Sequence, residues 1–469
     1  MINTNDRKGM NGVENMELFV KVMNTVNDIV WHPVMCVFLM IAAVWFTVRL
    51  KGMQVRRVKD MAKCLLEKGD NKQDKALSPF QAFATTVGGR IGTGNIAGTA
   101  TAIFMGGPGA IFWMWITGIL GMATKYAETL IALKYRVKSK DGTMIGGAMY
   151  ALDRGLHMKW LGIIFAFLTA VCGLGIGCMV QSNSVAQNLQ DNFGISPILT
   201  AFVLTIIVML VILNGIQGIA KVAEKLVPFM ATIYFIASII ILIINFKNIP
   251  QAIKLIVSEA FSLKSAASGI TGYAIFIAMR YGIARGVFSN EAGLGTAPIA
   301  HAASNTNNPI KQGMWGIFEV FNTLIICILT GLVIISSNLY LHGNTAADGA
   351  VLTSLAFKEA IGIFGEIVIT IASILFAFST IIGWSYYGET CLGYLTKRNK
   401  IVIMSYKIIF IIVIIIGATA DLKAIWAISD TFNGLMAIPN LIGVILLSPI
   451  VITMVKKYIK NPNSVELEY

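Results

Sequence analysis

A stretch of thirteen residues that occurs twice decides the fold of this chain, as RIGTGNIAGTATA at residues 90–102 and as RGVFSNEAGLGTA at residues 285–297. Six residues match in one register, Arg-x4-Asn-x-Ala-Gly-x-x-Thr-Ala, at a separation of 195 positions. Glycine-broken segments at corresponding places of two halves indicate the binding site of a transporter. Small residues are common in membrane helices, so a chance match is the competing explanation. The shared Arg and Asn favour a true repeat.

The composition indicates a polytopic membrane protein. Hydrophobic residues make up 56% of the chain and charged residues only 13%, whereas soluble domains carry about 25% charge. A helix needs about 20 mainly apolar residues to span a bilayer. Apolar runs occur at residues 34–48, 110–133, 161–180, 198–213, 227–244, 316–335, 367–382, 401–417 and 435–454. With the two repeated segments, around residues 79–105 and 273–301, we predict eleven spans.

The placement of charge predicts the orientation. The net charge is +13, and nine Lys or Arg residues lie between Arg49 and Lys75, directly after the first span. Basic loops stay in the cytoplasm, so we expect a cell-membrane protein with its N-terminus outside and its C-terminus inside. Lys247, Lys254 and Lys264 fall on the predicted outside and argue against this orientation. A charge distributed in this way does not indicate a nucleic-acid partner.

Two repeats of five spans follow the first span. An odd number of spans makes the second repeat enter from the opposite face, so the repeats are inverted, as in many secondary transporters. Short connecting helices are expected at residues 250–262, which suit the outer interface, and at 345–360 and 420–429. The predicted parts are a polar N-terminal segment (1–30), an additional transmembrane helix (31–51), a basic cytoplasmic loop (52–78), the first repeat (79–246), an interfacial connection (247–272), the second repeat (273–457) and a cytoplasmic tail (458–469).

The first repeated segment predicts a broken helix. Its glycines, at positions 88, 89, 92, 94 and 98, each weaken a helix by up to about 1 kcal/mol relative to alanine. Unwound backbone at membrane depth is tolerated where it lines a cavity. Its carbonyls are free to coordinate sodium, and the N–H groups near Thr93 and Asn95 are free to hold a carboxylate. Close helix packing through small residues is the alternative, but the polar side chains of Thr93 and Asn95 favour binding.

Several longer motifs resemble those of the alanine or glycine:cation symporter family. They are FQAFA (80–84), GTGNI (92–96), GGPGAIFWMW (106–115), GMATKYAE (121–128), MVQSN (179–183), RGVFSNEAGLG (285–295) and FSTIIGWSYYG (378–388). The resemblance covers nearly all of the chain from residue 79. It implies an all-helical LeuT-like fold and sodium-coupled uptake of small neutral amino acids, chiefly alanine and glycine, by alternating access.

The resemblance also implies roles for single residues. The carboxylate-binding break would be formed by Gly92, Thr93, Gly94 and Asn95. Sodium would be held by the carbonyls of Gly88 and Ile91 and the hydroxyls of Ser379 and Thr380. Such a Ser-Thr pair more often bonds its own helix, which is the alternative for these two hydroxyls. Sodium is then the coupling ion, and no other cofactor is expected.

Further polar and aromatic residues are candidates from their positions. Gln181 is expected beside the substrate, while Asn183 is left open between substrate contact and helix bracing. Trp384 would wall the pocket against large side chains or, alternatively, mark the membrane interface. Arg90, Arg285 and Glu291 are expected to pair at the two ends of the pathway as gates, in preference to binding substrate directly, since an unpaired charge at membrane depth costs at least about 2.5 kcal/mol.

Other function classes fit less well. The four histidines are scattered and no HExxH, GxSxG or Walker A motif occurs, so an enzyme is not expected. An ion channel remains an alternative because glycine-broken helices also build selectivity filters. A proton-coupled amino-acid carrier of the same fold is the other alternative. Saturable, ion-driven uptake of substrate would distinguish a carrier from a channel.

Overall fold

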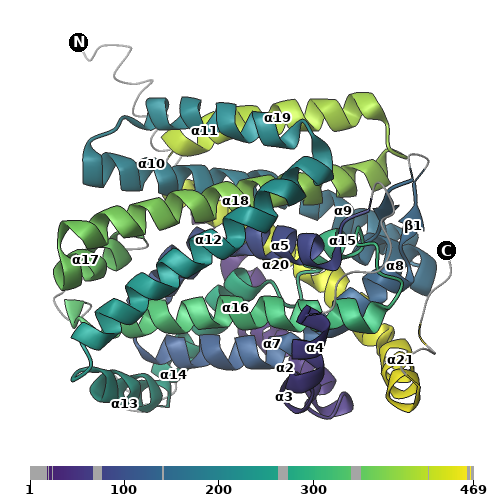
Figure 1. The fold of residues 1–469 in the computed structure, drawn as a ribbon, viewed down its shortest axis with the longest axis horizontal. Coiled ribbons are helices and arrows are strands. Elements are labelled where there is room, and N and C mark those ends of the chain that lie inside the picture. Colours follow the sequence, from purple (N-terminus) through teal and green to yellow (C-terminus); the bar gives the residue numbers. More distant parts are fainter. Residues whose placement is uncertain are drawn as a thin grey trace.

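The computed structural model is a bundle of long helices that run mostly in one direction, with α13 and α17 at one end and α8 and the β1–β2 hairpin at the other (Figure 1). It describes residues 25–66, 76–139, 142–261, 273–339, 350–420 and 422–461, together with residues 18, 21–23 and 465. Much of the predicted N-terminal segment (1–30), part of the basic loop (67–75), residues 262–272 and 345–349, and most of the predicted tail lie outside these residues.

Before the repeats the structure describes α2 (Pro33–Arg49), α3 (Met53–Arg56) and α4 (Val58–Leu66), and residues 25–30 ahead of α2 are also helical. The first repeat contains α5 (Pro79–Arg90), the π-helical turn η1 (Gly94–Gly98), α6 (Thr99–Gly106), α7 (Gly109–Lys134), β1 (Val137–Lys138), β2 (Met144–Ile145), α8 (Ala148–Leu156), α9 (Lys159–Leu174), the π-helical turn η2 (Gly175–Met179), α10 (Val180–Phe193), α11 (Pro197–Ile212) and α12 (Gly215–Ile244). The remaining helices are α13 (Ile249–Ala260), α14 (Tyr273–Asn290), α15 (Ala297–His301), α16 (Pro309–Ser336), α17 (Ala350–Ile361), α18 (Ile363–Leu395), α19 (Lys400–Thr419), α20 (Leu422–Leu446) and α21 (Ser448–Lys460).

Seven helices within the described residues are long and apolar enough to cross a membrane by length and composition alone. They contain α2, the continuous α9–η2–α10, α12, α16, α18, α19 and α20. The other four of the eleven expected spans depart from a simple apolar helix for visible reasons. α7 carries Lys125, Glu128 and Lys134, α11 has only 16 residues, and the two repeated segments are broken.

The two broken helices lie side by side and antiparallel, because α5 packs on α15 and α6 packs on α14. A short backbone bridge joins them at one end, where the N–H of Leu77 donates to the carbonyl of Ala303 (3.0 Å) and the N–H of Asn305 to the carbonyl of Leu77 (2.7 Å). α5 begins directly after this bridge with a capping box, in which Ser78 and Gln81 bond each other's backbone N–H. The repeat in the sequence therefore becomes a pair of opposed half-helices at the centre of the fold.

α18 packs against α5 with almost no side chain between the two backbones. A Cβ placed on Gly383 would lie 2.7 Å from the Cα of Gly89, closer than any real Cβ contact. Glycine at both positions therefore brings the two helix backbones together. This close approach lies one turn of α18 beyond Thr380 and one residue beyond Gly88, both predicted sodium ligands.

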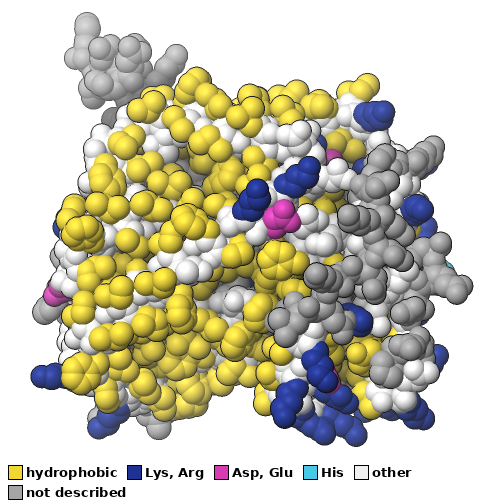
Figure 2. All heavy atoms as spheres, in the orientation of Figure 1, with side chains coloured by type: hydrophobic (Ala, Val, Ile, Leu, Met, Phe, Trp, Pro, Cys, Tyr) yellow, Lys and Arg dark blue, Asp and Glu magenta, His cyan; other side chains and the backbone are white. Residues whose placement is uncertain are grey.

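Hydrophobic side chains cover most of the face shown in Figure 2, as expected for a surface in contact with lipid. Lys and Arg side chains gather at its lower right, over α3 and α4 (Figure 2). These helices follow the first span, where the sequence predicted a basic cytoplasmic loop, so the basic end of the molecule is the expected inner end. The orientation itself stays a prediction.

The structure corrects two predictions near the C-terminus. The short connecting helix expected at residues 420–429 is wrong, because residues from Leu422 onward belong to the long helix α20. The span expected at residues 435–454 is displaced, because α20 ends at Leu446 and α21 begins anew at Ser448. Pro449 stands in the first turn of α21, and a proline disfavours helical backbone in the residue before it. The sequence also missed α3, α4, α8 and the β1–β2 hairpin.

Candidate functional site

The first helix breaks directly after Arg90, and its free backbone groups turn toward α10. The N–H of Gly92 bonds the carbonyl of Arg90 (2.8 Å) instead of continuing the helical ladder. The N–H and the hydroxyl of Thr93 then both donate to Oε1 of Gln181, at 3.1 and 3.0 Å. Thr93 and Gln181 are 1% and 2% exposed. The structure therefore brings together the predicted carboxylate-binding break and the predicted substrate neighbour.

The orientation of the Gln181 amide is fixed from its other end. Its Nε2 donates to the carbonyl of Ile176 (3.1 Å), inside the π-helical turn η2. The amide oxygen therefore faces Thr93 as an acceptor. Because one carboxylate oxygen accepts the same pair of hydrogen bonds, the donors of Thr93 suit a carboxylate equally well.

Asn95 joins the two broken helices. Its Nδ2 donates to the carbonyl of Arg90 (3.0 Å), and its Oδ1 accepts hydrogen bonds from the hydroxyl of Ser289 and from Sγ of Cys327 (3.4 Å). All of these groups are buried. Ser289 and Cys327 were missed by the sequence reading, although Ser289 lies inside the repeated stretch. Asn95 thus holds the break in place from inside the bundle.

Three of the four predicted sodium ligands, Gly88, Ser379 and Thr380, meet at the junction of α5 and α18. The Thr380 hydroxyl donates to the carbonyl of Gly88 (3.2 Å), whereas the Ser379 hydroxyl donates to Phe376 of its own helix (2.9 Å). Ser379 thus makes the local bond named as its alternative, and its lone pairs stay available. Ile91 lies at the end of α5 and is fully buried. Hydroxyl and carbonyl oxygens suit a hard cation such as sodium.

At Gly92 and Gly94 a side chain would collide with neighbouring residues. A Cβ on Gly92 would lie 2.5 Å from Oγ1 of Thr380 and 2.9 Å from Oε1 of Gln181. A Cβ on Gly94 would lie 2.4 Å from the ring of Phe288. Gly92 therefore lies between Thr380, a predicted sodium ligand, and Gln181, a predicted substrate neighbour, with no room for a methyl group between them.

Trp384 is buried inside the protein. It is 2% exposed, its Cβ lies against Gly177 of η2, and its ring packs on Tyr387 at 5.6 Å between centroids. A ring buried in this way does not face lipid headgroups, which favours the pocket over the interfacial alternative. Gly177 precedes Gln181 by one helical turn, so the position is compatible with a wall of the pocket, which stays a prediction.

The predicted gate residues Arg90 and Glu291 join a buried cluster of charges. Nη2 of Arg90 lies 2.5 Å from a carboxylate oxygen of Glu319 and 3.6 Å from one of Glu291. The hydroxyl of Thr296 donates to Glu291 (2.5 Å), and Nε2 of His301 lies 2.9 Å from the second oxygen of Glu319. These side chains are almost fully buried. The cluster begins at Arg90, where α5 ends and the break starts.

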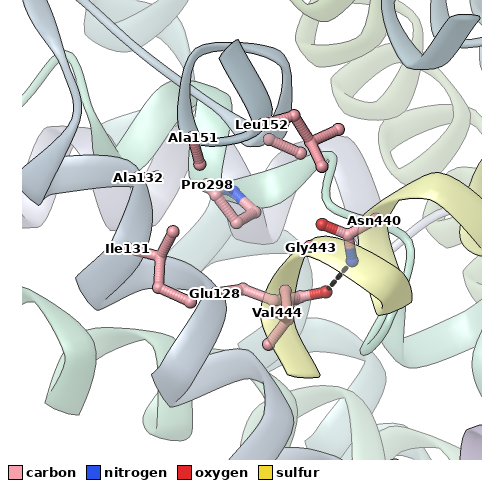
Figure 3. Close-up of a pocket in the computed structure, with 10 residues that line it drawn as sticks. Glu128, Ile131, Ala132, Ala151, Leu152, Pro298, Asn440, Gly443 and Val444 are labelled. Carbon is pink, nitrogen blue, oxygen red and sulfur yellow. Dashed lines mark hydrogen bonds between the residues drawn. The ribbon is translucent and has the colours of Figure 1, made fainter. Parts of the chain in front are cut away.

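Lys125 extends this cluster to α7. Its Nζ donates to the backbone carbonyl of Glu291 (2.7 Å) and lies 3.3 Å from Glu128. Glu128 in turn accepts hydrogen bonds from Nδ2 of Asn440 (2.5 Å) and from the N–H of Gly293 (3.0 Å). Figure 3 shows Glu128 and Asn440 pointing toward each other from α7 and α20, beside a cavity of about 10 Å³, which is the room of one water molecule.

Arg285 forms a different pair, away from Glu291. Its guanidinium donates two hydrogen bonds to the carboxylate of Asp430, at 3.0 and 2.7 Å, and stacks on Trp426 at 4.8 Å from the ring centroid. Arg90 and Arg285 match in the repeat, yet they lie in opposed half-helices and bind different acids. The expected arrangement of pairs at two ends is therefore compatible with the structure, with Asp430 as an additional partner.

Four residues of these networks escaped the sequence reading: Glu319, His301, Asp430 and Asn440. Glu319 stands alone in an otherwise apolar span, which is a general signal for a functional residue. His301 closes the second repeated segment. The charges of Arg90 and Arg285 demanded acidic partners, but the sequence did not say which helix supplies them.

An inverted pair of broken helices, a polar break buried at the centre and charged clusters on either side define a multi-pass membrane transporter. The chain belongs to the sodium:alanine symporter family, whose model matches residues 16–468. The family consists of symporters and not of enzymes, and it implies sodium as the coupling ion.

Relatives span almost the whole chain. The sodium/alanine symporter AgcS of Methanococcus maripaludis is 45% identical over 94% of this chain and 97% of the relative. The probable sodium/glutamine symporter GlnT of Bacillus subtilis is 37% identical over 95% of this chain and 92% of its own. The putative sodium/proton-dependent alanine carrier YrbD of the same organism is 35% identical over 92% and 91%.

Solved structures agree on the fold. A Na⁺-coupled sialic acid symporter superposes with a TM-score of 0.52 at 13% identity, over 91% of this chain and 98% of that chain. A manganese transporter of Eremococcus coleocola superposes with a TM-score of 0.51 at 14% identity, over 83% and 81%. The predicted LeuT-like inverted-repeat fold is confirmed.

Proposed function

We propose that this protein imports small neutral amino acids, alanine and glycine, together with sodium by alternating access. The observation that carries the proposal is the pair of donors on Thr93, which hold an amide oxygen of Gln181, one residue from Gly92 and its contact with Thr380. The name of the sodium/alanine symporter AgcS supports the same substrate.

The break binds the substrate through its carboxylate. The N–H and hydroxyl of Thr93 donate to the carboxylate in place of Gln181, whose amide moves aside. The positive end of the following half-helix favours the negative charge. Gly92 and Gly94 keep the backbone open at this point. Phe288 against Gly94 and Trp384 against Gly177 leave room for a small side chain only.

Sodium binds on the other side of Gly92. The carbonyls of Gly88 and Ile91 and the hydroxyls of Ser379 and Thr380 provide oxygen ligands, once the Thr380 hydroxyl turns away from Gly88. Because Gly92 touches both sites, each ligand orders backbone that the other needs. Sodium and alanine should then raise each other's affinity by the same factor.

The charged networks act as the two gates. The cluster of Arg90, Glu291 and Glu319 closes the inner side, and Arg285 with Asp430 closes the outer side. Both are assembled in this structure, and the Thr93 break between them is buried. Alternating access then consists of breaking one set of contacts while the other holds.

The test is uptake of radiolabelled L-alanine and glycine into proteoliposomes that contain the purified protein. Concentrative uptake is expected with an inward sodium gradient and not with potassium in place of sodium. Thr93→Val should abolish it, because valine lacks the donating hydroxyl. Thr101→Val is the matched control, since the Thr101 hydroxyl bonds only its own helix at Ala97 (2.7 Å).

Each result has a distinct meaning. Wild-type uptake in the Thr93→Val variant would contradict the assignment of the carboxylate site. Uptake driven equally by a proton gradient would contradict the choice of sodium. A linear, non-saturating flux would indicate a channel.

A further inference from the structure

The inner cluster has more negative than positive side chains in direct contact. Arg90 and Lys125 carry two positive charges, whereas Glu128, Glu291 and Glu319 carry three negative ones. Every one of these side chains is less than 5% exposed. A buried carboxylate without a compensating charge is costly, because it has lost its water and gained no partner. Among these five side chains the carboxylates outnumber the cations by one, and a further positive charge would balance them.

His301 is placed to supply that charge. Its Nε2 faces Glu319 at 2.9 Å, and its Nδ1 faces the amide nitrogen of Gln312 at 2.8 Å. His301 and Gln312 are both fully buried. A neutral imidazole with its hydrogen on Nε2 donates to Glu319 and accepts from Gln312. In this arrangement Oε1 of Gln312 makes no hydrogen bond within the described part of the chain.

Gln312 also suits the protonated form of the histidine. Rotating its amide by half a turn presents Oε1 to Nδ1, and the imidazolium then donates to Gln312 and to Glu319 at once. The same surroundings thus suit the neutral and the protonated imidazole without movement of the backbone. A glutamine is one of the few neutral side chains that can make this exchange.

Charged and titratable groups surround His301. α15 packs on α5, α7 and α18. Glu319 contacts His301 directly, and Arg90 binds the same carboxylate. Lys125, Glu291 and Tyr387 are further charged or titratable groups near Glu319, and Glu128 lies beyond Lys125. Arg136, just beyond α7, directs its guanidinium to the carbonyls of Ala302, Ser304 and Thr306, at the end of α15.

We propose that His301 is a proton-binding site of the closed carrier, and that its imidazolium neutralises the inner cluster. Hydronium gives the proton to Nδ1, so that one O–H bond breaks, one N–H bond forms and a neutral water molecule is left. When the inner gate opens, as the proposed function requires, water screens the cluster and the proton leaves. Acidity on the inner side then holds the gate closed. The site is distinct from the break that binds substrate and sodium.

The proton site can be tested on the purified full chain without transport. Thermal unfolding is measured between pH 8.5 and 5.5 for the wild type, His301→Gln and His157→Gln, the last being an exposed histidine as control. A group that binds its proton in the folded state stabilises that state as the pH falls through the range of histidine, near about 6.5. The unfolding temperature of the wild type should therefore rise relative to His301→Gln on acidification, and keep a constant difference from His157→Gln.

The direction of this change decides the proposal. A histidine that stays neutral in the fold would give the opposite sign, because acid would protonate it only in the unfolded chain. A constant or shrinking difference between the wild type and His301→Gln therefore overturns the proposal. If His301→Gln fails to fold, Glu319→Gln takes its place, because it removes one negative charge at similar shape. The unfolding temperature of the wild type must then rise relative to Glu319→Gln as the pH falls.

Transport provides the functional counterpart. Lowering the internal pH of proteoliposomes should slow sodium-driven alanine uptake in the wild type and in His157→Gln, but not in Glu319→Gln. Equal slowing in Glu319→Gln would overturn the gate role of the proton. If the wild type takes up no alanine, the proposed function fails, whereas the unfolding series still decides the proton site by itself.

Discussion

Gly92→Ala is the substitution that the geometry of the site predicts most sharply. Its Cβ would lie 2.5 Å from Oγ1 of Thr380 and 2.9 Å from Oε1 of Gln181. Both distances are well below an ordinary contact, so both side chains must move away from the break. One added methyl group therefore disturbs the predicted sodium site and the predicted substrate site together.

The magnitude follows from the cost of overpacking. An extra methyl group in a close-packed interior typically costs about 1–3 kcal/mol. The added methyl group occupies the space between the Thr93 donors and Thr380, beside which both ligands are proposed to bind, so this cost appears as weaker binding of sodium and of alanine. Since 1.4 kcal/mol is about a factor of ten, we expect the apparent affinity for each ligand to fall by roughly 5- to 150-fold.

The assay is the sodium dependence and the alanine dependence of initial uptake rates in proteoliposomes. Gly98→Ala is the matched control, because it lies in the same break and the nearest atom to its Cβ would be 4.0 Å away, on the ring of Phe288. This control should transport like the wild type. Unchanged affinities in Gly92→Ala, or an equal loss in Gly98→Ala, would refute the view that Gly92 separates the two sites.

Three further predictions concern the ion site and the charged networks. Thr380→Val removes the hydroxyl that meets α5, so the sodium concentration for half-maximal uptake should rise by about tenfold, the effect of roughly 1.4 kcal/mol; an unchanged sodium response would remove this residue from the site. Arg285→Lys keeps the charge but loses the two-bonded geometry with Asp430, so uptake should fall by about tenfold, and a wild-type rate would contradict the gate. Lys125→Met leaves Glu128 without its buried cation and should destabilise the fold by about 3–5 kcal/mol, seen as a lower unfolding temperature. The double variant with Glu128→Gln should regain part of that loss, and simple addition of two losses would contradict the pairing.

The centre of the fold could be predicted from the sequence because the repeated segment marks the two helices that meet there. Equal positions in two inverted halves must meet at the axis between them, so the breaks after Arg90 and near Glu291 could be placed together without a structure. Glycines and the polar residues Thr93 and Asn95 also indicated which backbone groups would be free. The fold class followed from hydropathy, period and the number of spans.

The partners of the charged residues could not be predicted in the same way. Arg90 and Arg285 are equivalent in the repeat, but Glu319 comes from α16 and Asp430 from α20, outside the repeated stretch. Which acid faces which arginine depends on the rotation of whole helices about their axes, and an apolar span contains little information on that rotation. The ends of α20 and α21 were missed for a related reason, because hydropathy continues across the interruption at Leu447.

The glycine contact between α5 and α18 has a consequence for motion. Helices normally lock together because the side-chain ridges of one lie in the grooves of the other, and displacement must lift each ridge out. At Gly383 the backbone of α18 meets that of Gly89 with no side chain between them, and the Tyr387 side chain packs on Gly89 one turn further along α18. At this contact α5 can rotate or slide along α18 at low energetic cost while the two helices stay packed together. A carrier whose ion is held between α5 and α18 needs such a contact there, since the two helices must shift in every transport cycle without separating.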